Sequence, residues 1–231
     1  MPKHCYTLIF ISLLMLTCQS TQEPKIAPLL LARTFLLQEK GQYVTYAVEQ
    51  IQYGINQSVE KQTYQLQYQL QSSEKQVSGE EKLIIVQRRR NTPQQNWQTE
   101  QLVQIMVYTD KVIQVEQNIP LYLLPSPLVV GQTWNYHQYN TLGKAIASLQ
   151  AIKNTFVVNH QTFPQTAHVI QYQDSTALGQ KSQLTVYAAN IGMIFLKKTD
   201  VSYCYQPHCL GKAIIDFGSI TTYQITDYGK E

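Results

Sequence analysis

The sequence predicts a mainly β protein, built as a curved antiparallel sheet or half-barrel of about ten strands with one N-terminal helix. Polar and apolar residues alternate strictly over Thr63–Gln71, the pattern of a strand with one buried and one solvated face. Sixteen Tyr against two Trp and six Phe also favour strands. Short turns separate the strand-like segments without helices between them, which excludes a parallel sheet built from βαβ units.

The clearest predicted strand has two distinct faces. The face expected in the core holds Tyr64, Leu66, Tyr68 and Leu70. The face expected in solvent holds Gln65, Gln67, Gln69 and Gln71. Such a strand belongs to an antiparallel sheet that packs on one side and meets water on the other.

The remaining elements are read from periodicity and from Gly and Pro. A helix is expected over Pro28–Lys40, because Pro suits the first helical position and Gly41 the residue after the last, although so short an apolar run also fits a buried strand. Asn118–Pro127 carries three Pro and cannot be a central strand. Further strands are expected at Tyr43–Val48, Lys82–Gln87, Leu102–Thr109, Lys111–Glu116, Gln132–Tyr139, Lys144–Val158, Thr166–Gln173, Lys181–Ala188, Met193–Thr199 and Ile214–Asp227.

The first residues have the parts of an export signal. Lys3 gives a basic start, and Tyr6–Leu16 is an uncharged run of signal-core length that is too short to span a bilayer. We therefore expect a signal peptide at 1–17, a linker at 18–27 and a single β-rich domain at 28–231. The length of 231 residues suits one domain.

Cys18 directly follows the apolar run and is the expected lipidation site. Leu14–Cys18 resembles the lipobox of bacterial lipoproteins, although Thr17 stands where that motif prefers Gly or Ala. The alternative is ordinary cleavage after Ser20, which would leave a soluble periplasmic protein. If Cys18 carries the lipid, the lipobox resemblance and Gln19 imply the periplasmic face of the outer membrane.

Cys204 and Cys209 are expected to form a disulfide. They bracket four residues that include the turn-forming Pro207, and an exported chain enters an oxidising compartment. The alternative is a metal site that adds His208, but three local ligands without a second pair at zinc-finger spacing argue against it. We expect no metal and no cofactor.

Charge excludes some partners. Only 14% of the residues are charged and the net charge is +3, so the chain has no basic field for nucleic acid. The one dense charge run is Arg88, Arg89 and Arg90, expected at a solvated hairpin end or in contact with an anionic lipid surface or an envelope protein. Glu80 and Glu81 are expected to be solvated at a strand edge.

No catalytic motif is present. The sequence has no nucleophile elbow, no zinc-protease helix and no phosphate-binding loop. The mature-chain histidines, which are scattered without shared spacing, are His137, His160, His168 and His208. We therefore expect a protein that is not an enzyme.

Three short motifs resemble uncharacterised bacterial envelope lipoproteins: Pro127–Trp134, Phe163–Ile170 and Tyr187–Ile194. That resemblance implies a curved antiparallel sheet like that of the outer-membrane lipoprotein carriers and receptors (LolA/LolB-like). It covers under a third of the chain, and the carrier function does not transfer with it. Within the motifs, Gly131 and Gly192 are expected in turns and Trp134 and Phe163 in the core or at its rim.

The sequence thus favours a non-enzymatic lipoprotein of the outer membrane or periplasm, held at the membrane by its N-terminal lipid. It would act as an interaction or assembly factor, with another envelope protein as partner, or as a carrier of an apolar ligand. An envelope enzyme with a spatially assembled site and a structural envelope component are the alternatives.

Overall fold

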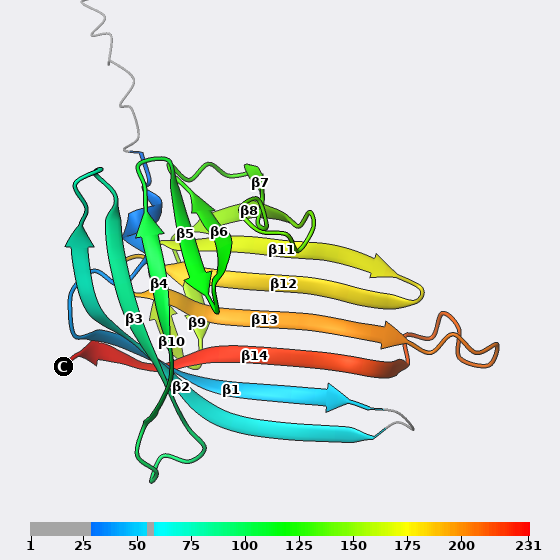
Figure 1. The fold of residues 1–231 in the computed structure, drawn as a ribbon. Helices are drawn as coiled ribbons and strands as arrows, with labels where there is room; N and C mark the ends of the chain where they lie inside the picture. Colours follow the sequence, from blue (N-terminus) through cyan, green and yellow to red (C-terminus); the bar gives the residue numbers. More distant parts are fainter. Residues whose placement is uncertain (1–28, 55–57) are drawn as a thin grey trace, which may run out of the picture.

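A twelve-stranded antiparallel sheet dominates the computed structural model, which describes residues 29–54 and 58–231 (Figure 1). The sheet order is β6-β5-β4-β3-β2-β1-β14-β13-β12-β11-β8-β7. The strands of this sheet are β1 Gln42–Tyr53, β2 Val59–Lys75, β3 Glu81–Arg90, β4 Gln98–Val107, β5 Lys111–Glu116, β6 Ile119–Pro125, β7 Thr133–Asn135, β8 Ile146–Lys153, β11 Thr166–Thr176, β12 Gly179–Ala188, β13 Gly192–Tyr203 and β14 Ile215–Lys230. The expected signal peptide, Cys18 and the linker lie outside the described residues.

The sheet curves until its two edge strands nearly meet. The Tyr122 N–H of β6 donates to the Tyr136 carbonyl just after β7, at 2.9 Å. Trp134 Nε1 donates back to the Tyr122 carbonyl at 2.8 Å, and Asn140 Nδ2 donates to the Pro120 carbonyl at 2.7 Å. The result is a nearly closed barrel. The proline-rich segment forms an edge strand, as expected for residues that lack backbone donors.

The predicted N-terminal helix is wrong. Only Ala32–Phe35 is helical, as one 3₁₀ turn named η1, and the residues around it are extended. Backbone groups of this segment bond to other parts of the fold: the Leu30 carbonyl accepts from Leu128 N–H at 2.8 Å, and the Thr34 carbonyl accepts from Asn190 N–H at 2.7 Å. The segment is apolar on all sides, and this sequence pattern fits a buried helix as well as an extended plug that fills the barrel end.

The plug formed by residues 29–40 closes one end of the barrel. Its buried side chains are Ala32, Phe35, Leu36 and Leu37. Arg33 fixes the plug to β3 through two hydrogen bonds to Glu81, Nε to Oε2 at 2.7 Å and Nη2 to Oε1 at 2.9 Å. Glu81 is therefore paired and not solvated as expected. None of the helical segments within the described residues is long and apolar enough to cross a membrane.

The stretch expected as one strand at Lys144–Val158 is divided into β8 and β9, Phe156–Val158. β9 pairs with β10, Gln161–Phe163, in a separate hairpin. Phe156 of this hairpin packs against Phe195 of β13, with ring centroids 6.0 Å apart, and Asn159 Nδ2 donates to the Ile225 carbonyl of β14 at 3.3 Å. The hairpin thus covers part of the outside of the barrel.

The expected faces of β2 are partly correct. Leu66 and Leu70 are buried, and Tyr64 and Tyr68 are half-buried on the same face. On the other face Gln67 is only 3% exposed, which contradicts the expected solvent position. Its Oε1 accepts from Arg88 Nη1 at 3.3 Å, so the neighbouring strand supplies the hydrogen bond that burial requires.

Candidate ligand-binding cavity

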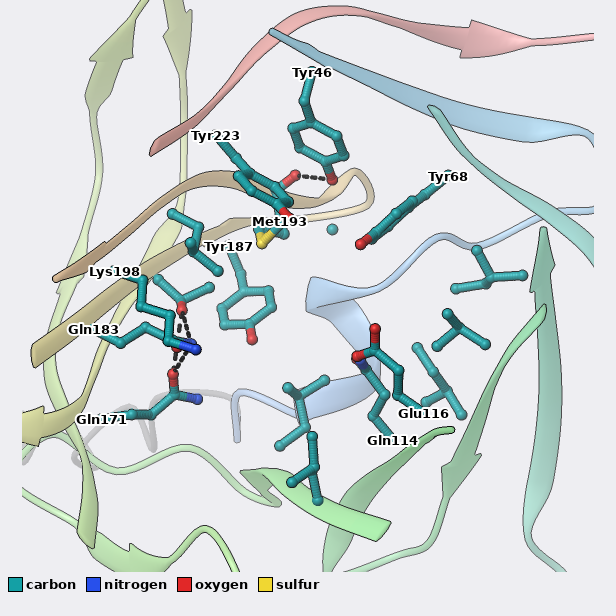
Figure 2. Close-up of a pocket in the computed structure, with 18 of the residues that line it drawn as sticks. Tyr46, Tyr68, Gln114, Glu116, Gln171, Gln183, Tyr187, Met193, Lys198 and Tyr223 are labelled. Carbon is teal, nitrogen blue, oxygen red and sulfur yellow. Dashed lines mark hydrogen bonds between the residues drawn. The ribbon is translucent and has the colours of Figure 1, made fainter. Parts of the chain in front are cut away.

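A cavity of about 520 Å³ lies inside the barrel (Figure 2). This volume lies within the usual range of small-molecule binding sites. Near the plug its lining is aliphatic, with Leu36 and Leu37 from the plug itself and Ile105 and Leu123 from β4 and β6. The alternation that predicted strands also explains this lining, because every second residue of each strand points inward.

The lining becomes polar at one level of the sheet. Strand register aligns five inward residues across five adjacent strands, and we name them the polar row: Gln50, Thr221, Lys198, Gln183 and Gln171. Lys198 is exposed, so the polar row lies where the cavity meets solvent.

The next inward row, two residues closer to the plug on each strand, is mostly apolar. The register aligns its members as Val48, Tyr223, Leu196, Thr185 and Val169. Two residues along a strand span roughly 6–7 Å. Of this row, Tyr223, Leu196 and Thr185 line the cavity, so its wall becomes less polar over the length of two residues.

Gln171 lies at this boundary, and among the described residues its side-chain oxygen makes hydrogen bonds whereas its side-chain nitrogen does not. Its Oε1 accepts from Gln183 Nε2 and from Thr185 Oγ1, the latter at 3.4 Å. Its Nε2 is buried and has no hydrogen-bond partner within residues 29–54 and 58–231, while the whole residue is 1% exposed. Figure 2 shows this nitrogen pointing away from Gln183 into the cavity. A buried donor without a partner is costly, so this atom is a candidate for ligand contact.

The opposite wall carries a carboxylate held by amides. Gln101 Nε2 donates to Glu116 Oε1 at 2.8 Å and to Gln87 Oε1 at 2.8 Å. Gln114 Nε2 donates to Glu116 Oε2 at 3.2 Å. Glu116 and Gln114 project toward the cavity across from Gln171 and Lys198 (Figure 2). The polar level of the cavity therefore contains one cation and one anion on facing walls.

Buried tyrosines form much of the remaining wall. Burial raises the pKa of Tyr46, Tyr68 and Tyr187 far above the usual range, so all three hydroxyls stay neutral at physiological pH. Tyr46 donates to the Met193 carbonyl at 2.8 Å, and its ring packs edge-on against Tyr68 with centroids 5.5 Å apart. These rings add apolar surface and retain hydroxyl groups, which suits a ligand of mixed polarity.

One histidine reaches the cavity. His137 Nδ1 lies 3.1 Å from the Gly143 carbonyl oxygen, and Nε2 lies 2.6 Å from the Tyr172 hydroxyl. The carbonyl can only accept, so Nδ1 carries the proton and Nε2 accepts from Tyr172. Within residues 29–54 and 58–231 no carboxylate hydrogen-bonds to His137. The pair has the geometry of a structural hydrogen bond.

The three arginines form contacts within the barrel wall. Arg90 Nε donates to Gln65 Oε1 at 2.6 Å, next to the bond from Arg88 to Gln67 on the same face. Arg89 lies on the inner face, 3.8 Å above the Tyr64 ring. They end β3 next to the loop that leads to β4, so they lie at a hairpin end as expected, but they are half-buried and not fully solvated. Contact with an anionic surface stays a prediction.

Cys204 and Cys209 face each other in the loop between β13 and β14. Their Cα atoms lie 5.8 Å apart and their sulfurs are bonded in the structure. His208 Nδ1 or Nε2 lies within 4.8 Å of both sulfurs, so the same three residues also fit the geometry of a metal site. Sulfurs joined in a disulfide are no longer thiolates, the form that ligates a metal, and the bonded geometry fits the predicted disulfide.

Sequence reasoning missed the cavity lining. Gln171 and Gln183 sit at inward positions of strands whose other inward residues include Val169 and Tyr187. A glutamine at a core position of an alternating strand was the available signal. It was lost because glutamines occur at so many outward positions of the same sequence, and only pairing register separates the two kinds.

Comparisons with known proteins find distant structural similarity and no family. No family model matches the sequence, and no curated protein matches it. The chain is similar to a solved structure from Bacteroides fragilis, assigned as an exported protein with a YmcC-like fold, at 10% identity and TM-score 0.45, over 84% of this chain and 100% of that chain. It is also similar to a structure from Parabacteroides distasonis assigned as a lipoprotein, at 8% identity and TM-score 0.45, over 85% of this chain and 99% of that chain.

Similarity at this level carries no argument about the function of this chain. Export is assigned to the first of those proteins and lipidation to the second. Neither assignment extends to this chain. The narrower resemblance to the LolA/LolB-like carriers stays a prediction.

Proposed function

We propose that this protein is a non-enzymatic binding protein of the bacterial envelope that holds a small amphipathic ligand inside its barrel. The observation that carries the proposal is the cavity of about 520 Å³, aliphatic at the plug and polar at its other level. A purely structural component would gain stability by filling such a space with side chains, because close packing is the norm in protein cores.

The envelope location rests on the sequence. A basic start, an uncharged run and Cys18 at its end support export and N-terminal lipidation. A lipid on Cys18 would hold the barrel at a membrane from which a membrane-derived ligand can enter it. The outer membrane is the proposed destination.

The chemistry of the cavity supports binding and not catalysis. His137 is hydrogen-bonded to a tyrosine and a carbonyl, and Glu116 accepts from two glutamine amides. In the described part of the chain neither hydrogen-bonds to a Ser, Thr, Cys or Lys side chain. General acid–base catalysis needs a proton-transfer group within reach of a reacting atom and with a pKa near the working pH.

The cavity is tested with N-phenyl-1-naphthylamine, an apolar dye whose fluorescence rises in apolar sites. We expect saturable binding to the purified mature protein. Ile105→Trp should weaken binding at least ten-fold by filling the aliphatic part of the cavity, and Val103→Phe is a smaller filling change on the same strand.

The matched control is Leu102→Trp, which places the same ring on the same strand at an outward and 60% exposed position. It should leave the dye affinity unchanged. Absence of saturable dye binding to the unmodified protein, with its thermal unfolding intact, would contradict the proposed function.

Lipidation is tested separately by the intact mass of protein extracted from membranes. We expect a mature chain that begins at a diacylated Cys18. A free N-terminus at Thr21 would instead identify a soluble periplasmic protein, and the ligand would then have to reach the barrel from solution.

Binding of an envelope protein is the second candidate function. Three hairpin ends that are adjacent in the sheet expose large apolar side chains, which a partner protein could cover. They are Val59, Leu178, Tyr205, Leu210 and Phe217. A photo-crosslinker at Phe217 should capture one defined protein in intact cells, and a crosslinker at outward Leu102 should not.

A further inference from the structure

We infer that the ligand presents an acyl carbonyl oxygen to the Gln171 amide, with its hydrocarbon chain on the aliphatic lining toward the plug. This inference rests on the proposed function and specifies its ligand. It starts from a buried side-chain donor of the cavity that lacks a partner among the described residues.

The orientation of the Gln171 amide is fixed by its neighbours. Gln183 Nε2 donates to the Gln171 oxygen in the structure. Thr185 Oγ1 donates to that same oxygen. The amide nitrogen is thus left to point into the cavity with two hydrogens to donate, and only an acceptor can complement it.

The position of Gln171 decides where that acceptor lies within the ligand. Gln171 belongs to the polar row, and the next row toward the plug places Leu196 and the Tyr223 ring against the cavity. The acceptor therefore sits at the junction between the apolar and polar parts of the ligand. An acyl compound has its carbonyl oxygen at this junction, whereas an alkane has no acceptor at all.

The charges at the polar level allow two sources of the acyl group. Lys198 lies in the polar row two strands from Gln171, and among the described residues it has no ion pair. Glu116 faces it from the opposite wall. A free fatty acid would pair its carboxylate with Lys198, whereas a neutral acyl ester would leave the two charged groups in water. The carbonyl oxygen is common to both.

The test is displacement of N-phenyl-1-naphthylamine by laurate and by monolauroylglycerol, each below its aggregation concentration. With Gln171→Leu we expect the affinity for the displacing compound to fall about ten-fold. This corresponds to the loss of roughly 1.4 kcal/mol that one buried hydrogen bond supplies. The dye itself lacks a carbonyl, so saturable dye binding should persist in the variant and show that the cavity is folded, and the dye affinity measured for each variant is used to convert displacement into affinity for the acyl compound.

The control is Gln173→Leu, the same substitution at an exposed position two residues along β11 and outside the cavity lining. Lys198→Met separates the sources: laurate displacement that weakens identifies a carboxylate paired with Lys198, whereas a monoglyceride that displaces the dye while laurate does not, or while laurate is unaffected by Lys198→Met, identifies a neutral acyl ester. Both results support the inference when Gln171→Leu weakens the same compound.

If the acyl compounds displaced the dye equally well from the unmodified protein and from Gln171→Leu, the inference would be overturned. The proposed function of the cavity would remain intact. Failure of both acyl compounds to displace bound dye would overturn it too. Failure of the dye itself to bind would instead contradict the proposed function, so the two failures are distinguishable.

Discussion

The two ends of the same long strands differ in what their inward residues do. Toward the plug, the inward residues of β1, β2 and β13 are apolar or aromatic and buried, as at Tyr46, Leu66 and Ile194. Toward the hairpins, the inward residues are polar, as at Gln62 and Lys198, and solvent reaches them. One sheet thus supplies a packed core at one end and an open polar face at the other, and the cavity lies at the transition.

The largest expected effect compares two inward positions of β2, four residues apart. Leu66→Asp should destabilise the fold by about 3–5 kcal/mol, because it buries a charge without a partner. Gln62→Asp on the same face should change stability by about 0.5 kcal/mol or less, because Gln62 is exposed. Chemical denaturation of both variants measures the difference. Similar losses in the two would show that the core extends to the hairpin end.

A smaller effect is expected from the loop at the hairpin end. Replacing Cys204 and Cys209 together by Ala should cost about 2 kcal/mol or less, since the disulfide closes a short loop. Hydrogen exchange should rise mainly at the adjoining ends of β13 and β14, with the plug end unchanged.

Peptide mapping without reductant should first find the two cysteines in one linked fragment. Two free thiols, or a stoichiometric metal that a chelator removes, would contradict the disulfide and favour the site with His208.

The smallest expected effect concerns the ion pair between Arg33 and Glu81, which anchors the plug to β3. Hydrogen bonds from Arg33 hold the pKa of the Glu81 carboxyl below its usual value of 4.5. The pair therefore contributes stability above that value and loses it as the pH falls through the lowered pKa. Glu81→Gln should lose about 1 kcal/mol at neutral pH and show a flatter decline of the thermal midpoint in acid.

Glu80→Gln is the control, because Glu80 bonds only to Ser78 in its own turn and not to the plug. An acid profile of Glu81→Gln that parallels the unmodified protein would show that the ion pair does not anchor the plug.

Patterns local to one strand were the most predictable. The alternation in Thr63–Gln71 identified β2 and the buried positions of Leu66 and Leu70, and the prolines placed β6 at an edge. Trp134 and Phe163 are buried as expected. The plug was mispredicted because its backbone partners are distant in sequence, and Gln67 was mispredicted because the arginine that satisfies its buried amide lies on the next strand.

The sequence by itself determined a mainly β chain with an export-like start, since both follow from residue type and short-range periodicity. Only the tertiary structure decided that the sheet bends into a nearly closed barrel, and that Gln171, Gln183, Lys198, Thr221 and Gln50 form one row. The physical reason is strand register. Side-chain direction alternates within each strand, but which inward residues become neighbours depends on pairing between strands far apart in the chain.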